Sequence, residues 1–106
     1  MKVEVLYFKG CPNHEVVVEQ VLQAASAEGV PVKVDEVEVC DAAMAQELGF
    51  PGSPTIRVEG LDIEPSARDT HAFGFGCRTY LEEGVRSGRP SVRMIQQALA
   101  EAGSRR

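Results

Sequence analysis

Residues 8–14 place a cysteine where a predicted buried strand gives way to a predicted helix. Gly10 permits a sharp turn between the two, and Pro12 suits the first helical turn because its missing N–H would have no partner there. Cys11 is therefore expected at a helix N-terminus, where free N–H groups and the positive end of the macrodipole favour an anion. Because the thiolate is the reactive form of cysteine and such a position favours it, Cys11 is the candidate nucleophile. The alternative is a buried structural cysteine in a turn.

His14 follows Cys11 by three residues, a spacing that on a helix places two side chains one turn apart on the same side. As a cation His14 would stabilise the thiolate, and as a neutral base it would accept the thiol proton. The alternative is that His14 is merely an exposed residue of the first turn. Cysteine and histidine also bind zinc, but a structural site needs four ligands, and only His71 and the other two cysteines could complete one. Since no Cys-x-x-Cys pair is present, we expect no resident metal and no cofactor.

Cys40 directly follows the second predicted strand and is the candidate second thiol. The C-terminal ends of parallel strands share one edge of a sheet, so Cys40 and Cys11 are expected at the same pole. There Cys40 would act as a resolving thiol, if the two Cα atoms come within about 7 Å, or as a soft-metal ligand. The alternative is a small apolar residue packed beneath the second predicted helix. Cys77 is expected at the opposite pole as a core residue, unless the long loop before it folds back over the active edge.

The elements that position these residues follow the order β-α-β-α-β-β-α. Strands are predicted at 3–8, 30–39, 55–59 and 77–81, and helices at 15–28, at 42–48 between an Asp41 cap and Gly49, and between a Ser91 cap and Gly103. The helices are expected to turn apolar faces to the core: Val17, Val21 and Ala24 with Val18, Leu22 and Ala25 beside them in the first, Met44 and Leu48 in the second, and Ile95, Leu99 and Ala102 in the last. The second strand loses its alternation at Asp35-Glu36, which suits an edge strand with a bulge. Residues 60–76 show little periodicity and are predicted to form a long surface loop. The order predicts an α/β fold with one four-stranded mixed sheet flanked by helices.

Length and composition favour a single domain over residues 1–106. The chain is 43% hydrophobic and 25% charged, as globular proteins are, and its length buries a core without disulfides or a structural metal. Three cysteines without a signal peptide indicate a reducing, cytoplasmic location, and no apolar run approaches the length of a membrane span. The net charge is −5 and the only dense basic cluster is Arg105-Arg106, so neither nucleic acid nor a membrane is expected as a partner.

The chain resembles the thioredoxin superfamily in its minimal, glutaredoxin-sized form. The likeness covers nearly the whole chain in element order and depends on two local motifs. One is Gly-Cys-Pro-Asn-His at 10–14, in the position of that superfamily's Cys-x-x-Cys. The other is Gly-Ser-Pro-Thr at 52–55, just before a strand, where thioredoxins carry a cis-proline. With the later Cys-Arg-x-Tyr at 77–80, the chain is also similar to small bacterial thioredoxin-like proteins associated with organomercurial lyases.

The resemblance implies a substrate site around Lys9, Ser53 and Pro54. A cis Ser53–Pro54 bond would turn the Ser53 backbone toward Cys11, so that its free N–H and C=O could pair with an extended substrate segment. Lys9 is a candidate to hold a carboxylate of glutathione or to stabilise the thiolate, although any solvent-facing turn lysine would look the same.

His14 stands where a dithiol enzyme of this superfamily has its second cysteine, so the ordinary intramolecular cycle is not available from this motif. The expected function is a monothiol-type thiol-disulfide oxidoreductase, in which glutathione or a partner protein resolves Cys11. Three alternatives remain open: resolution by another cysteine, a binding or carrier protein for thiophilic metals such as mercury(II), and a non-catalytic thioredoxin-fold interaction module.

Overall fold

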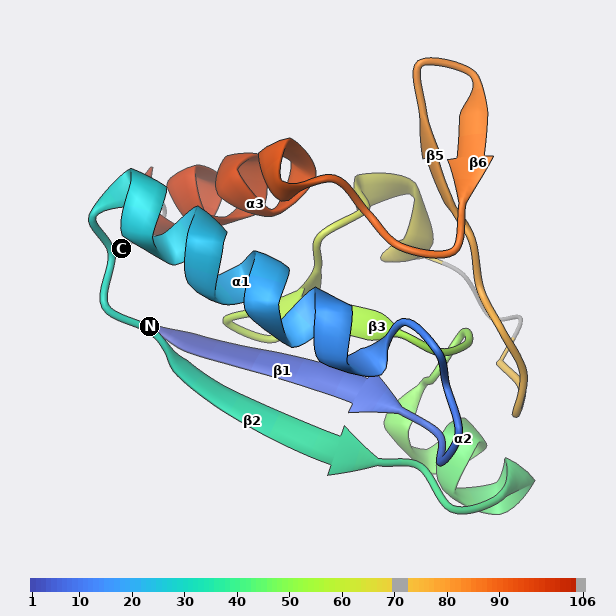
Figure 1. Cartoon of the computed structure of the whole chain (residues 1–106). Coiled ribbons are helices and arrows are strands. Elements are labelled where there is room, and N and C mark those ends of the chain that lie inside the picture. Colours follow the sequence, from blue (N-terminus) through green and yellow to red (C-terminus); the bar gives the residue numbers. More distant parts are fainter. Residues whose placement is uncertain (70–72, 105–106) are drawn as a thin grey trace.

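The protein is built around a four-stranded mixed sheet with helices on both faces (Figure 1). The computed structural model describes residues 1–69 and 73–104, so His71 and the Arg105-Arg106 pair lie outside the described residues. The elements in chain order are β1 (Lys2–Tyr7), α1 (His14–Glu28), β2 (Lys33–Glu38), α2 (Ala42–Leu48), β3 (Thr55–Val58), β4 (Leu61–Asp62), the short 3₁₀ helix η1 (Pro65–Ala67), β5 (Tyr80–Glu82), β6 (Val85–Ser87) and α3 (Val92–Ser104).

Strand β1 is central in the sheet, whose strand order is β2-β1-β3-β4. It pairs in parallel with β2 and antiparallel with β3, and β4 adds an antiparallel edge. The predicted α/β class, the mixed four-stranded sheet and the edge position of β2 are confirmed. The predicted bulge at Asp35-Glu36 is wrong, because the register runs without interruption from Lys2–Lys33 to Tyr7–Glu38. The acidic residues instead lie on a strand that has one free edge and one partly solvated face, where polar side chains are tolerated.

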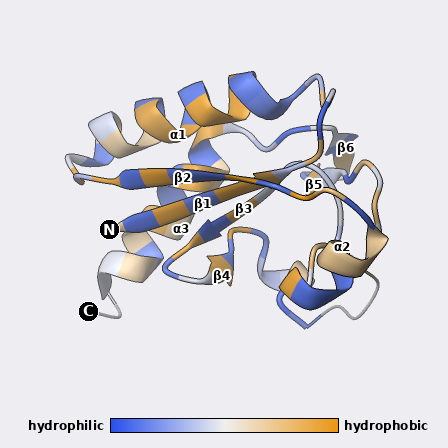
Figure 2. Cartoon of the chain, turned by 90° about the horizontal axis from the view of Figure 1, so that it is seen from below, coloured by the Kyte–Doolittle hydropathy of each residue, from blue (hydrophilic) through white to orange (hydrophobic). Residues whose placement is uncertain are grey.

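The sheet divides the hydrophobic core into a large and a small cluster. Side chains alternate across a strand, so Val3 and Val5 face α1 and α3 while Leu6 faces α2; Figure 2 shows apolar residues recurring along β1 and α1. The small cluster consists of Leu6, Val39, Ala45 and Phe50. The large cluster consists of Val3, Val5, Val17, Val21, Ala24, Ala25, Ile56, Val58, Ile63, Tyr80, Ile95, Ala98, Leu99 and Ala102. Most of the apolar helix residues predicted from the sequence are therefore buried, but Leu22 is 52% exposed, and Met44 and Leu48 are only partly buried.

Two helices begin at the caps that the sequence predicts. The Asp41 side chain accepts a hydrogen bond from the Met44 N–H (2.8 Å), and Ser91 Oγ accepts one from the Met94 N–H (3.1 Å). Each side chain satisfies a backbone donor that would have no partner at the start of a helix. Helix α2 has the predicted bounds, whereas α3 continues through Gly103 to Ser104.

The segment between β3 and α3 departs most from prediction. The predicted loop at 60–76 contains β4 and η1, and β4 is the fourth strand of the sheet. The expected strand at 77–81 is wrong, because β5 pairs only with β6 in a separate antiparallel hairpin. Strand β4 has two residues and follows a tight turn at Glu59-Gly60, both at positive φ, so it is too short to show an alternating pattern.

Candidate functional site

Cys11 lies in the turn that joins β1 to α1, with its side chain half-buried. Its N–H donates to the Phe8 carbonyl (3.1 Å), and its own carbonyl accepts from the His14 N–H (3.4 Å). Helix α1 begins at His14 with Asn13 as its N-cap, so Cys11 stands two residues before the cap. The expectations that Pro12 occupies the first helical turn, and that residues 11 and 14 are one helical turn apart, are wrong. Two successive tight turns take up these residues before the helix starts.

His14 is held by two neighbours from the sheet. Its ring stacks on Tyr7, with centroids 3.5 Å apart and planes within 6°, and its Nε2 lies 2.6 Å from Oε1 of Glu36. The side chain is 18% exposed, so the reading of His14 as merely an exposed residue is wrong. A carboxylate can only accept, so Nε2 carries the proton of this hydrogen bond. In a neutral ring, Nδ1 is then the nitrogen left to act as a base.

Cys40 is exposed at the end of β2 in an acidic corner of the molecule. Its Sγ lies 3.8 Å from both the carbonyl oxygen and Oε2 of Glu38, and its N–H lies 3.4 Å from Sδ of Met44. The alternative of an apolar residue packed beneath α2 is therefore wrong. The pKa of the neighbouring Tyr7 hydroxyl is raised, first by the partial burial of its side chain and then by the negative charges of Glu38 and Glu36. Among the described residues, the polar contacts of Cys40 are with Glu38 and Met44 and not with Cys11.

The Ser53–Pro54 peptide bond is cis, as the resemblance implied. Ser53 is 1% exposed, and its Oγ accepts a hydrogen bond from the Phe8 N–H (3.3 Å). The Pro54 carbonyl accepts a hydrogen bond from the buried Tyr80 hydroxyl (2.6 Å). The cis-proline loop is thus fastened directly to the end of β1, three residues before Cys11.

The backbone of Ser53 is not free, which corrects the expected open cradle. Its N–H donates to the Gly76 carbonyl (2.8 Å), and its carbonyl accepts from the Arg78 N–H (3.0 Å). Ser53 and Cys77 form a parallel bridge, so residues 76–78 occupy the position expected for an extended substrate. Cys77 is exposed and lies at this edge of the sheet, so the expectation of a core residue at the opposite pole is wrong. The described residues 73–76 lead to this edge, in agreement with the stated alternative.

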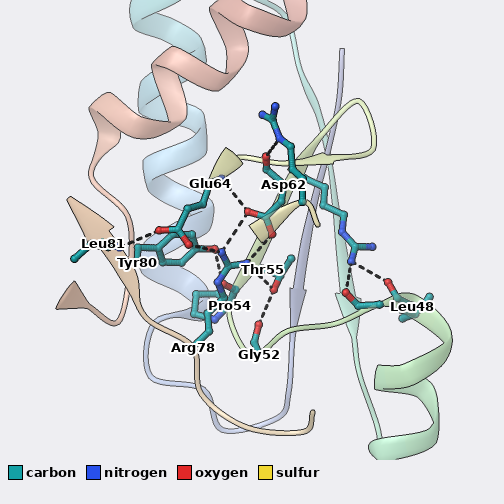
Figure 3. A network of polar contacts seen from close by, with 12 residues as sticks. Leu48, Gly52, Pro54, Thr55, Asp62, Glu64, Arg78, Tyr80 and Leu81 are labelled. Carbon is teal, nitrogen blue, oxygen red and sulfur yellow. Dashed lines mark hydrogen bonds and ion pairs between the residues drawn. The ribbon is translucent and has the colours of Figure 1, made fainter. Parts of the chain in front are cut away.

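Arg78 anchors this segment through a buried polar network (Figure 3). Its guanidinium donates to Asp62 Oδ2 (2.7 Å), to Glu64 Oε1 (3.2 Å) and to Thr55 Oγ1 (3.2 Å), and it lies 4.1 Å from the centre of the Tyr80 ring. Burial alone would lower the pKa of Arg78, but Tyr80, Asp62 and Glu64 together raise it. The buried charge of Arg78 is therefore compensated by two carboxylates, which offsets part of the cost of taking it out of water.

Sequence reasoning missed this network, for which the Cys-Arg-x-Tyr spacing at 77–80 is the only local indication. Gly52 is part of it, because a Cβ at this position, with φ +146°, would lie 2.7 Å from the Cβ of Arg78. A shallow hollow of about 400 Å³ adjoins the segment and is lined by Pro51, Phe73, Gly74, Phe75, Gly76 and Cys77.

The remaining predicted features are placed as follows. Lys9 is exposed in the turn before Cys11. Over residues 1–69 and 73–104, no three histidine, cysteine or acidic side chains form a group able to hold a metal ion. No helix in the same ranges combines the length and apolar character needed to cross a membrane.

Comparisons of the chain with protein-family models, with curated proteins and with solved structures give no match. The function of the chain is therefore inferred from its α/β fold and from the residues around Cys11 and Ser53–Pro54.

Proposed function

We propose that the protein is a thioredoxin-like thiol-disulfide oxidoreductase with Cys11 as its nucleophile. The observation that carries this proposal is the hydrogen bond from the Phe8 N–H to Ser53 Oγ. It joins the turn bearing Cys11 to the cis Ser53–Pro54 loop at one end of the sheet. The half-buried Cys11 is thus linked through Phe8 to the 53–54 loop, which supports the relationship to the thioredoxin superfamily that the sequence motifs suggest.

In the proposed reaction, the Cys11 thiolate attacks one sulfur of a disulfide R–S–S–R′. The Cys11–S–S–R bond forms, and R′–S⁻ leaves and takes up a proton. His14 Nδ1 is the candidate acceptor of the Cys11 proton, since Nε2 is engaged by Glu36. A second thiol then attacks the sulfur of R, which releases the Cys11 thiolate and completes a two-electron reduction of the substrate.

The substrate that fits this site best is a low-molecular-weight disulfide. Residues 76–78 already use the N–H and C=O of Ser53, so an extended peptide could pair with this backbone only by displacing them. Lys9 is exposed in the turn two residues before Cys11, and its charge would attract a substrate carboxylate such as those of glutathione.

The test is reduction of bis(2-hydroxyethyl) disulfide by glutathione, catalysed by the full chain. Cys11→Ser should remove the catalysed rate, because serine cannot form the mixed disulfide. Cys40→Ser is the matched control, since Cys40 is exposed and its polar contacts are with Glu38 and Met44. It should retain the wild-type rate. A Cys11→Ser variant that folds, as judged by circular dichroism, and keeps its activity would exclude Cys11 as the nucleophile.

A further inference from the structure

Cys77 and Cys11 approach the same loop from two directions. Cys77 is the partner of Ser53 in a parallel bridge. Because successive side chains alternate between the two faces of a sheet, two residues in register across a bridge project from the same face. Ser53 Oγ accepts a hydrogen bond from the Phe8 N–H, so the Ser53 side chain points toward Phe8. The Cys77 side chain therefore projects from the same face as Ser53, the face that is turned to Phe8. Cys11 is also hydrogen bonded to Phe8, because its N–H donates to the Phe8 carbonyl.

An aromatic contact brings the two segments together independently. The ring of Phe75, two residues before Cys77, lies 5.3 Å from the ring of Phe8, three residues before Cys11. Both cysteines are free thiols, and Cys77 is exposed to reagents. Two thiols are thus placed at one end of the sheet by a backbone bridge, a side-chain hydrogen bond and a ring contact.

The segment that carries Cys77 is held on both sides. Gly76 and Arg78 are each hydrogen bonded to the Ser53 backbone, and the Arg78 side chain is locked by Asp62 and Glu64 (Figure 3). Upstream, the Gly74 N–H donates to the Phe50 carbonyl (3.0 Å), and Gln46 donates to the carbonyl of Phe73 (3.0 Å). The position of Cys77 is therefore part of the folded structure and does not depend on a substrate.

We propose that Cys77 is the resolving thiol of Cys11, a role that rests on the proposed function. After a glutathione disulfide has reacted, the Cys77 thiolate attacks Sγ of Cys11 in the Cys11–S–S–glutathione intermediate. The Cys11–Cys77 disulfide forms, the bond to glutathione breaks, and glutathione leaves as a thiolate that takes up a proton. The pair of cysteines has then lost two electrons and the substrate has gained two. Two molecules of an external low-molecular-weight thiol return the protein to the dithiol form and leave as their disulfide.

The experiment follows the lifetime of the mixed disulfide at Cys11. Full-length protein at about 10 µM is mixed with one equivalent of glutathione disulfide, quenched with acid at intervals, alkylated, and digested without reduction for mass spectrometry. A short flexible tether gives an effective concentration on the order of 1 mM, and a thiol held in place by the fold at the same end of the sheet should reach at least this value. We therefore expect Cys77 to resolve the intermediate at least about 100-fold faster than a thiol of another copy at about 10 µM. The Cys77→Ser variant should therefore hold Cys11–glutathione at least about 100-fold longer than wild type.

Wild type and the matched control Cys40→Ser should both yield the Cys11–Cys77 peptide. Equal lifetimes of Cys11–glutathione in wild type and Cys77→Ser, or a Cys11–Cys40 peptide in wild type, would refute the role of Cys77 while leaving Cys11 as a nucleophile. Absence of any modification of Cys11 in all three proteins would refute both this role and the proposed function. Circular dichroism checks that Cys77→Ser is folded. Because Cys77 is exposed, replacing its sulfur by oxygen should leave the fold unchanged.

Discussion

Replacing Arg78 with methionine should remove about 3 kcal/mol from the free energy of unfolding. The Arg78 and Asp62 side chains are only 6% and 7% exposed, and Nη1 lies 2.7 Å from Oδ2. Removing one partner of such a buried pair costs about 3–5 kcal/mol, because the other charge is left uncompensated. The lower end applies here, since Asp62 keeps a hydrogen bond from the Glu64 N–H (2.9 Å).

Urea unfolding followed by circular dichroism measures this loss. With a slope of about 2 kcal/mol per molar urea, the midpoint should fall by about 1.5 M. The control is Glu101→Gln, which weakens the surface ion pair with Arg68 (2.9 Å, side chains 43% and 22% exposed) and should cost less than about 1 kcal/mol. If Arg78→Met cost no more than this control, the Arg78 network would not anchor residues 76–78 and the reasoning would fail.

Three further predictions concern single side chains. Burial raises the pKa of the Tyr80 hydroxyl above its ordinary value of 10.0, so the folded state keeps this proton at a pH where the unfolded chain loses it. The free energy of unfolding should therefore fall as the pH rises above about 10, by up to about 1.4 kcal/mol per pH unit. Tyr80→Phe should remove this pH dependence, as measured by urea unfolding at a series of alkaline pH values. Gly52→Ala should cost about 1–3 kcal/mol in urea unfolding, because its Cβ would lie 2.7 Å from the Cβ of Arg78. His14→Cys should create a dithiol with Cys11 and raise disulfide reductase activity with a thioredoxin reductase or glutathione system, and no gain would count against the assigned site.

Matched variants check the first two of these. Tyr7→Phe removes another tyrosine whose pKa is raised, but its side chain is only half-buried, so a smaller change of slope than for Tyr80→Phe is expected. A larger change would mean that the pH dependence of stability does not come from Tyr80. Gly74→Ala meets no atom within 4 Å of its new Cβ and should stay within about 0.5 kcal/mol of wild type. Equal losses for Gly52→Ala and Gly74→Ala would show that the close approach at Gly52 is unimportant.

The parts of the fold that were predicted from the sequence depend on local patterns. The apolar spacing of Val17 and Val21 predicted the buried face of α1, and Asp41 and Gly49 marked both ends of α2. Such features arise from neighbours within a few residues. The start of α1 was predicted to within one residue, but the conformation of residues 11–13 was not, because the two tight turns around Cys11 leave no periodic pattern.

The missed parts of the site depend on contacts between segments far apart in the chain. The bridge between Ser53 and Cys77 spans 24 positions, and Arg78 meets Asp62 only once β4 has joined β3. No spacing rule links these residues, and a buried arginine looks like any surface arginine in the sequence. The cis Ser53–Pro54 bond was expected from a family resemblance, while the closure of the Ser53 backbone by residues 76–78 could be seen only in three dimensions.

The unequal division of the core should also divide the molecule into regions of different local stability. The face covered by α1 and α3 buries a large apolar cluster. Among the described residues, the buried cluster on the face of α2 is smaller: it consists of Leu6, Val39, Ala45 and Phe50, with Val37, Met44 and Leu48 partly buried against it. Regions with few buried apolar contacts open with less free energy than the whole domain, so backbone amides of α2 should exchange with solvent sooner than those of α1. Gly74 is hydrogen bonded to Phe50 in this weaker region, so a local opening of α2 would release the chain leading to Cys77 while the rest of the sheet stays folded.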